Sequence, residues 1–298
     1  MMAAITVEHL SKRYGTVTAL RDLSFEVAAG QVVALLGPNG AGKTTTLEVL
    51  EGYQAPTGGL VRVLGAAPRH ADRAWRSRIG LVLQSTSLDA QLTVREALRT
   101  YAGLFPHPRP VGEVLELTDL GGEANTRIGR LSGGQRRRVD VGLGIISRPE
   151  LLFLDEPTTG LDPAARRQAW TAIAGLTAVG ATVLLTTHYL EEAQQLADRV
   201  VVVAGGRLVA DARPHELRSR GALSTIRFLL PAGAPTADLP ATLAGGVDPG
   251  RGELVVRTAE VADALGALVG WAGRHRLDLA GLEVGPPSLE DAYLHLID

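Results

Sequence analysis

The sequence contains no cysteine and only two lysines, Lys12 and Lys43. Without cysteine the chain can form neither disulfides nor thiolate-ligated metal sites, and it is compatible with a reducing compartment. No uncharged apolar run reaches the roughly 18 residues that a membrane-spanning helix needs. The first residues also lack the basic stretch and apolar run that mark a signal peptide. We therefore expect a soluble chain that reaches a membrane only through a partner.

The charges are unevenly distributed. Residues 1–220 carry 25 Lys and Arg against 22 Asp and Glu, whereas residues 221–298 carry 5 against 10. This change predicts a large domain over 1–220 and a small one over 221–298. The net charge of −2 predicts no strong attraction to nucleic acid. The arginine run 136–138 lacks interleaved aromatics, so we interpret it as a solvated helix face rather than a nucleic-acid surface.

Short apolar runs alternate with helical patterns in the first domain, which predicts an α/β fold with a parallel sheet. Residues 3–28 read as β-rich, and residues 88–148 as mostly helical with a proline-rich break at 106–110. The second domain reads as a small α+β unit without a catalytic constellation. Its predicted strands and helices are 225–230, 253–258, 259–274, 277–284 and 289–296.

A glycine-rich segment lies between the predicted strand 31–36 and the predicted helix 43–50. It matches the pattern G-x-x-x-x-G-K-[ST], whose glycines let backbone N–H groups approach phosphate oxygens at a helix N-terminus. Lys43 is expected to reach the β- and γ-phosphates, and Thr44 to ligate Mg²⁺. The alternative is a glycine-rich turn before an ordinary helix. The predicted nucleotide-binding residues of this loop are Gly37, Pro38, Asn39, Gly40, Ala41, Gly42, Lys43, Thr44 and Thr45.

Asp155 and Glu156 end the apolar run 151–154, so they are expected at the carboxyl edge of the sheet beside the glycine-rich loop. Asp155 is predicted to hold Mg²⁺, directly or through water. Glu156 is predicted to orient and deprotonate the water that attacks a phosphate. Alone, such a pair is more often a solvated strand end, but together with the phosphate loop it indicates a nucleotide hydrolase.

The segment Leu131-Ser132-Gly133-Gly134-Gln135 precedes a predicted helix. Its hydroxyl and N–H groups suit an anion at a positive helix end. Because the phosphates of a bound nucleotide are already covered by the first loop, a second anion site indicates a phosphate presented by another chain. The alternative is a plain N-cap formed by Ser132.

These three segments, in this order, resemble the ATPase subunits of ATP-binding cassette (ABC) transporters, and the resemblance covers nearly all of residues 4–220. It implies a RecA-like core, an antiparallel β subdomain and a helical subdomain at about 88–148. It also implies that Tyr14 stacks on adenine and that Asp162, in Gly160-Leu161-Asp162, communicates across a dimer. Gln84 matches the hinge glutamine that senses the γ-phosphate and the metal, and His188 matches the switch histidine.

The resemblance further implies a head-to-tail homodimer. Each ATP then lies between the phosphate loop of one chain and Ser132, Gly133, Gly134 and Gln135 of the other. Glu156, His188 and Gln84 are the implied catalytic residues, and Thr44, Gln84 and Asp155 the implied Mg²⁺ ligands. Because Glu156 and His188 are both present, two competent sites are expected. The implied partner is an integral membrane permease, which places the chain on the cytoplasmic face of the cell membrane.

Two segments, 84–96 and 287–294, resemble the daunorubicin-resistance type of exporter, whose separate ATPase chain energises a permease of the ABC-2 type. This resemblance implies export of a drug, an antibiotic or another hydrophobic small molecule. Export of a lipid, a polysaccharide or another ABC-2 cargo stays open, as does a soluble ABC ATPase that acts on ribosomes or nucleic acid. The second domain is interpreted either as a regulatory or dimer-stabilising unit or as a packing appendage.

Overall fold

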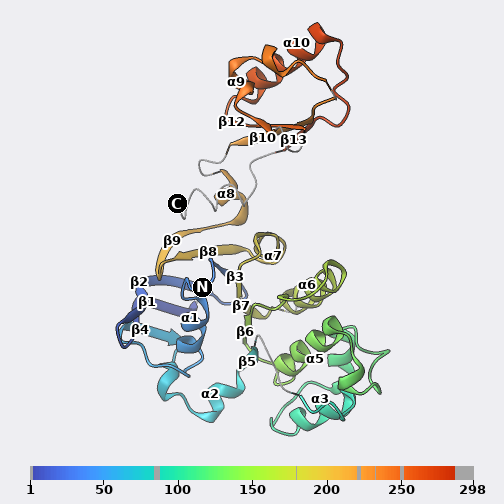
Figure 1. Ribbon diagram of the computed structural model, residues 1–298. Coiled ribbons are helices and arrows are strands. Elements are labelled where there is room, and N and C mark those ends of the chain that lie inside the picture. The colour runs from blue at the N-terminus through green and yellow to red at the C-terminus, as the bar shows by residue number, and fades with distance from the viewer. Residues whose placement is uncertain are drawn as a thin grey trace. The chain divides into compact units, whose positions relative to one another are not determined.

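The computed structural model describes residues 3–83, 88–178, 180–219, 223–231, 233–248 and 252–285 (Figure 1). The chain divides into two compact units, residues 1–214 and 215–298. The change in charge predicts a boundary at residue 220, which is a few residues after this division of the structure.

The described strands and helices of the first unit follow one another along the chain. They are β1 (Ala3–Tyr14), β2 (Val17–Ala28), β3 (Val32–Leu36), α1 (Lys43–Leu50), β4 (Gly58–Val63), η1 (Pro68–His70), α2 (Arg73–Ser77), β5 (Ile79–Val82), α3 (Val94–Ala102), α4 (Val111–Leu117), η2 (Ile128–Arg130), α5 (Gly133–Ile145), β6 (Leu151–Asp155), α6 (Pro163–Ala178), β7 (Thr182–Thr187), α7 (Leu190–Leu196), β8 (Arg199–Ala204) and β9 (Arg207–Ala212). The helix α8 (Pro214–Ser219) follows β9.

A six-stranded sheet with the order β5-β6-β7-β3-β8-β9 forms the centre of the first unit. Its strands are parallel except for β9, which pairs antiparallel with β8. Every residue of β3, β6 and β7 is buried, because helices and a second sheet cover the two faces of the sheet, and this explains the apolar runs 32–36 and 151–154. The predicted parallel sheet is confirmed. Its carboxyl edge brings the segments after β3, β6 and β7 together.

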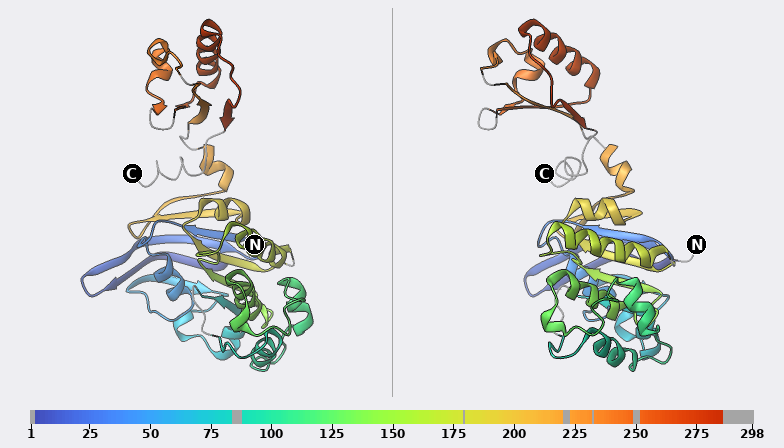
Figure 2. Two further views of the ribbon diagram at one scale, coloured as in Figure 1. Left: turned by 45° about the vertical axis from the view of Figure 1, so that its right-hand side comes forward. Right: turned by 90° about the vertical axis from the view of Figure 1, so that its right-hand side faces the viewer.

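An antiparallel sheet with the order β2-β1-β4 packs against this core. One apolar cluster joins the two sheets and the helix α1, and it includes Ile5, Phe25, Leu35, Leu47 and Phe153. Figure 1 shows β1, β2 and β4 in blue on the opposite side of the unit from the helices α3 and α5, and the left view of Figure 2 shows the same blue strands toward the left. The predicted antiparallel β subdomain is therefore confirmed.

The helical part of the first unit contains α3, α4 and α5. The helix α3 begins at a capping box in which Thr93 and Glu96 bond each other's backbone N–H groups. Between α4 and α5 only η2 is helical, so residues 88–148 are less helical than their sequence predicts.

The interpretation of the arginine run 136–138 as a solvated helix face is wrong for two of its residues. Arg136 is exposed, but Arg137 and Arg138 are buried, because backbone carbonyls accept their hydrogen bonds.

The second unit is a four-stranded antiparallel sheet with the order β11-β12-β10-β13. Its described elements are β10 (Ser224–Leu229), η3 (Thr236–Asp238), α9 (Ala241–Ala244), β11 (Val247–Asp248), β12 (Glu253–Thr258), α10 (Val261–His275) and β13 (Glu283–Gly285). Phe228, Leu254, Leu268 and Trp271 are fully buried between the sheet and the helices.

The predicted small α+β unit is confirmed, but the predicted strand 277–284 is too long. Of the predicted strand, only the part that belongs to β13 pairs with another strand. Leu279 and Leu282 close a turn through a 3.0 Å backbone hydrogen bond, and Gly281 has a φ of 80°, so this stretch cannot extend. The predicted helix 289–296 and the motif 287–294 lie outside the described residues. In the described ranges, no helix combines the length and apolarity needed to cross a bilayer.

Candidate nucleotide site

The glycine-rich loop runs from the end of β3 into the first turn of α1. Gly42 is the N-cap of α1 and has a φ of 103°. A Cβ atom at Gly42 would lie 2.5 Å from Leu20 Cδ2, and one at Gly37 would lie 2.2 Å from the carbonyl oxygen of Val203. Only glycine fits these two positions, so the loop is held in one shape by its neighbours. Pro38, Asn39, Gly40 and Thr44 are exposed, which leaves the outer surface of the loop open to a ligand.

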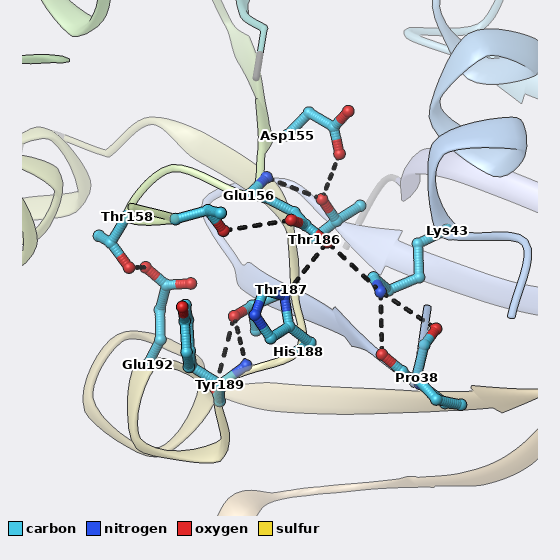
Figure 3. Close-up of polar contacts among 12 residues, drawn as sticks. Pro38, Lys43, Asp155, Glu156, Thr158, Thr186, Thr187, His188, Tyr189 and Glu192 are labelled. Atoms are coloured by element: carbon cyan, nitrogen blue, oxygen red, sulfur yellow. Dashed lines mark hydrogen bonds and ion pairs between the residues drawn. The ribbon is translucent and has the colours of Figure 1, made fainter. Parts of the chain in front are cut away.

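Lys43 is the central cation of the site. Its side chain is only 5 % exposed, and its Nζ donates to the carbonyl oxygens of Gly37 (2.9 Å) and Pro38 (3.3 Å). The same Nζ lies 3.5 Å from Glu156 Oε1 (Figure 3). This buried ammonium contacts one carboxylate and two loop carbonyls. An incoming phosphate can take the place of the carbonyls and accept stronger, charge-assisted hydrogen bonds from it.

Glu156 lies directly after β6, and its backbone has a φ of 44°, which non-glycine residues seldom adopt. Its N–H donates to Thr186 Oγ1 (2.9 Å) and to the Thr186 carbonyl (3.2 Å), which holds this conformation. Glu156 Oε1 lies 3.3 Å from His188 Nδ1, and Oε2 accepts a hydrogen bond from Thr159. The bend therefore directs the carboxylate between Lys43 and His188.

The pKa of Glu156 lies below its ordinary value. Burial alone would raise this pKa, but the hydrogen bond from His188, the charges of Lys43 and His188 and the hydrogen bond from Thr159 together lower it. The carboxylate is therefore ionised at neutral pH, which is the form that can accept a proton.

Asp155 is the last residue of β6 and is buried. Its Oδ1 accepts a 2.5 Å hydrogen bond from Thr186 Oγ1, so one threonine on β7 orients both Asp155 and Glu156. Thr186 was not predicted as a site residue from the sequence. It is one of three threonines in the six-residue strand β7, so its residue type alone did not distinguish it.

The segment 131–135 lies at the start of α5, apart from the phosphate loop. Ser132 Oγ accepts from the Gln135 N–H (3.2 Å), and Gln135 Oε1 accepts from the Ser132 N–H (2.9 Å). The N-cap alternative is thus present as a full capping box. Ser132 and Gly133 are nevertheless exposed. Gly134 is buried, and a Cβ there would lie 2.6 Å from Ala165 Cβ, so glycine permits α5 to approach α6.

Tyr14 and Asp162 are two further predicted site residues that the structure describes. Tyr14 is 41 % exposed at the end of β1, and its hydroxyl donates to Glu48 on α1. Asp162 is exposed, and its Oδ1 accepts from the N–H groups of Ala164 and Ala165 at the start of α6. These hydrogen bonds lower the pKa of Asp162. Gln84 lies outside the described residues.

Arg137 on α5 was likewise not predicted from the sequence to contact the segment around Asp155. Its guanidinium donates to the carbonyl oxygens of Pro157 (2.7 Å), Asp155 (3.0 Å) and Leu83, and it lies 3.7 Å from Asp140. Burial lowers the pKa of Arg137, and the charge of Asp140 opposes this effect. The side chain ties the helix that follows Ser132 to the strand end that carries Glu156.

Replacing Arg137 by Met is expected to lower the free energy of unfolding by about 3–5 kcal/mol, because Asp140 and several buried carbonyls lose their donor. The measurement is urea unfolding of the full chain. The matched control is Arg136→Met, whose exposed side chain should contribute less than about 0.5 kcal/mol. Equal effects of the two substitutions would show that the buried contacts do not stabilise this junction.

A glycine loop between strand and helix, a strand-end Asp-Glu pair and a buried lysine together define a P-loop nucleotide hydrolase. Comparison with known proteins narrows this class. The family described as "ABC transporter" matches residues 20–159, and the family described as "ABC transporter domain-containing protein-like, C-terminal domain" matches residues 224–288.

Two relatives and one solved structure show the extent of the similarity. The daunorubicin resistance ATP-binding protein DrrA3 of Streptomyces coeruleorubidus is 39% identical over 98% of this chain and 95% of its own length. A Nod factor export ATP-binding protein I of Rhizobium johnstonii is 45% identical over 72% of this chain and 70% of its own. The solved structure of an ATP-binding subunit of an ABC transporter is 28% identical, with a TM-score of 0.64 over 73% of this chain and 93% of that one.

The chain belongs to the ATP-binding subunits of ABC transporters and is an ATPase. The expected fold class and the resemblance to the daunorubicin-resistance group are confirmed.

Proposed function

We propose that the chain hydrolyses ATP with Glu156 as the general base and thereby powers the export of a hydrophobic small molecule through a separate membrane permease. The observation that supports the first part is the position of the Glu156 carboxylate, 3.5 Å from Lys43 and 3.3 Å from His188. Lys43 neutralises charge on the phosphates, Glu156 takes the proton of the attacking water, and His188 contacts the γ-phosphate.

The residues around Asp155 fit a magnesium ion bound together with ATP. Thr44 supplies an exposed hydroxyl and Asp155 a carboxylate, and Mg²⁺ prefers oxygen ligands from one or two carboxylates and the phosphates. Acidic side chains also gather around Asp155. Burial, and then the charges of Asp155 and Glu48, raise the pKa of the nearby Glu51 to about 7. When bound, the ion would neutralise charge on the phosphate oxygens. Gln84 is proposed as a further ligand from the family pattern.

A second copy of the chain is the proposed partner at the nucleotide. The exposed Ser132 and Gly133 lie at the positive end of the 13-residue helix α5. Because the glycine-rich loop of the same chain covers the phosphates of its own nucleotide, these two residues are left for a phosphate from a second chain. A head-to-tail dimer lets this segment cover the γ-phosphate bound by the partner subunit, while Tyr14 stacks on the adenine. Asp162, on the exposed loop before α6, is proposed to contact the partner.

A groove of about 260 Å³ is proposed as the contact for the permease. It lies between β5 and the helices α3 and α5, and its lining includes Leu83, Tyr101, Phe105 and Leu143. Leu83 and Tyr101 are partly exposed apolar side chains. The occupant that suits such a groove is an amphipathic segment of a membrane protein. This contact would hold the chain at the cytoplasmic face of the membrane.

Replacing Tyr101 by Glu tests the groove. The variant should lose at least about nine-tenths of the permease that co-purifies from detergent-solubilised membranes, because a buried unpaired charge opposes docking. The ATPase activity of the isolated chain should stay unchanged. Leu60→Glu on β4 is the matched control, since Leu60 has a similar exposure. Full co-purification with Tyr101→Glu would refute the groove assignment.

The cargo proposal rests on a relative that matches 98% of this chain, the daunorubicin resistance protein. Expressing the chain together with its permease in a drug-sensitive host should raise resistance to anthracycline-type compounds, and the same pair with Glu156→Gln should not. Unchanged susceptibility in both strains would refute the cargo while leaving the ATPase assignment intact.

A further inference from the structure

Glu192 on α7 is a fully buried carboxyl group that the proposed hydrolysis does not use. Its Oε1 accepts hydrogen bonds from Thr158 Oγ1 (2.8 Å) and Trp170 Nε1 (3.1 Å). Thr158 lies in the loop that leads from Glu156 to Asp162, and Trp170 lies on α6. One carboxyl therefore joins three segments, and Figure 3 shows it below Thr158 and beside Tyr189.

A second contact joins the same segments nearer to the phosphate. The guanidinium carbon of Arg166 on α6 lies 4.2 Å from the ring centroid of Tyr189. The Tyr189 ring in turn lies 4.1 Å from the ring of His188, centroid to centroid. Asp162 caps the first turn of this same helix α6. The loop with Asp162 and the segment with His188 are thus fastened to each other at two points.

We propose that Glu192 is a positioning residue that locks the His188 segment to the Asp162 loop, so that contact with the partner subunit at Asp162 sets the position of His188. This inference rests on the roles proposed above for Asp162 and His188. Through Glu192, the nucleotide site of one subunit would respond to contact with the other subunit.

The cost of burying Glu192 supports a role beyond packing. Burial raises the pKa of Glu192, while the hydrogen bonds from Thr158 and Trp170 and the charge of Arg166 oppose this rise. A leucine at this position would fill the core without a polar group to satisfy. Only an acceptor oxygen fixes the distance to two donors on different segments, because dispersion contacts have little directionality.

The test measures ATP hydrolysis by the full chain as a function of ATP concentration. Glu192→Ala is expected to lower kcat roughly 10- to 100-fold, as misplaced catalytic groups do, and to change KM by less than about 2-fold. Thr158→Val, which removes one donor without changing the volume, should lower kcat in the same direction. Glu192→Gln keeps an acceptor oxygen and should restore most of the rate. The matched control is Glu191→Ala, an exposed neighbour on the same helix.

The deciding measurement is made in a His188→Ala background. If Glu192 acts through His188, adding Glu192→Ala there lowers kcat by no more than about 2-fold, because residues that act as a unit are not additive. A loss as large as in the unmodified chain would overturn the inference and leave Glu192 a core residue. Activity of Glu192→Ala equal to that of Glu191→Ala would also overturn it. Full activity of Glu156→Gln, in contrast, would refute the proposed function itself.

Discussion

Glu156→Gln is expected to lower kcat for ATP hydrolysis by about 10²- to 10⁴-fold, because an amide of the same shape cannot accept the proton of the attacking water. ATP binding should persist, since Lys43 and the backbone of the loop remain. The variant should also accumulate as an ATP-bound dimer, measurable by light scattering after gel filtration. Single-turnover hydrolysis and nucleotide-binding titrations separate the two effects.

Glu191→Gln, a change of the same chemistry on the exposed face of α7, serves as the control and should keep the full rate. Hydrolysis by Glu156→Gln at the unmodified rate would show that another group activates the water.

The pH dependence of the rate is a second check on the role of Glu156. Because the pKa of Glu156 is lowered, its ionised form persists as the pH falls through the ordinary range of a glutamate. The rate should therefore decline only at a more acidic pH, where the carboxylate takes up a proton.

Lys43→Ala is expected to weaken ATP binding by about 10- to 100-fold, since charge-assisted hydrogen bonds to phosphate contribute about 1.5–3 kcal/mol. The free protein should change as well. Without the ammonium 3.5 Å away, the Glu156 carboxylate loses a stabilising charge and its pKa rises. Isothermal titration with ATP measures the affinity.

Arg62→Ala is the control for net charge, because Arg62 is an exposed residue of β4. It should leave the affinity for ATP unchanged. Equal affinity in Lys43→Ala and the unmodified chain would contradict the placement of the phosphates at this loop. Glu156→Gln and Lys43→Ala together separate catalysis from binding, because the first leaves the binding groups in place and the second removes one.

Much of the fold could be predicted because the relevant patterns are local. The helix 43–50 and the strand 253–258 have the bounds that their sequences predict. Other elements were missed because their local signal is weak. The helix α6 is rich in alanine without a clear apolar stripe, and β4 contains two glycines. The strand predicted at 277–284 is mostly a turn, since apolar content alone does not distinguish a strand from a packed loop.

The sequence by itself determined the family, the phosphate loop, the Asp155-Glu156 pair and the segment at Ser132, because each motif is contiguous and its chemistry depends on residue type and spacing. Only the tertiary structure decided which groups meet. It placed the Glu156 carboxylate between Lys43 and His188, made Thr186 the orienting hydroxyl for two acids, and buried Arg137 and Glu192 at junctions between segments. These pairs are separated by many residues along the chain. Their contact therefore follows from the strand order of the sheet and the packing of α5, α6 and α7, and no local pattern encodes that arrangement.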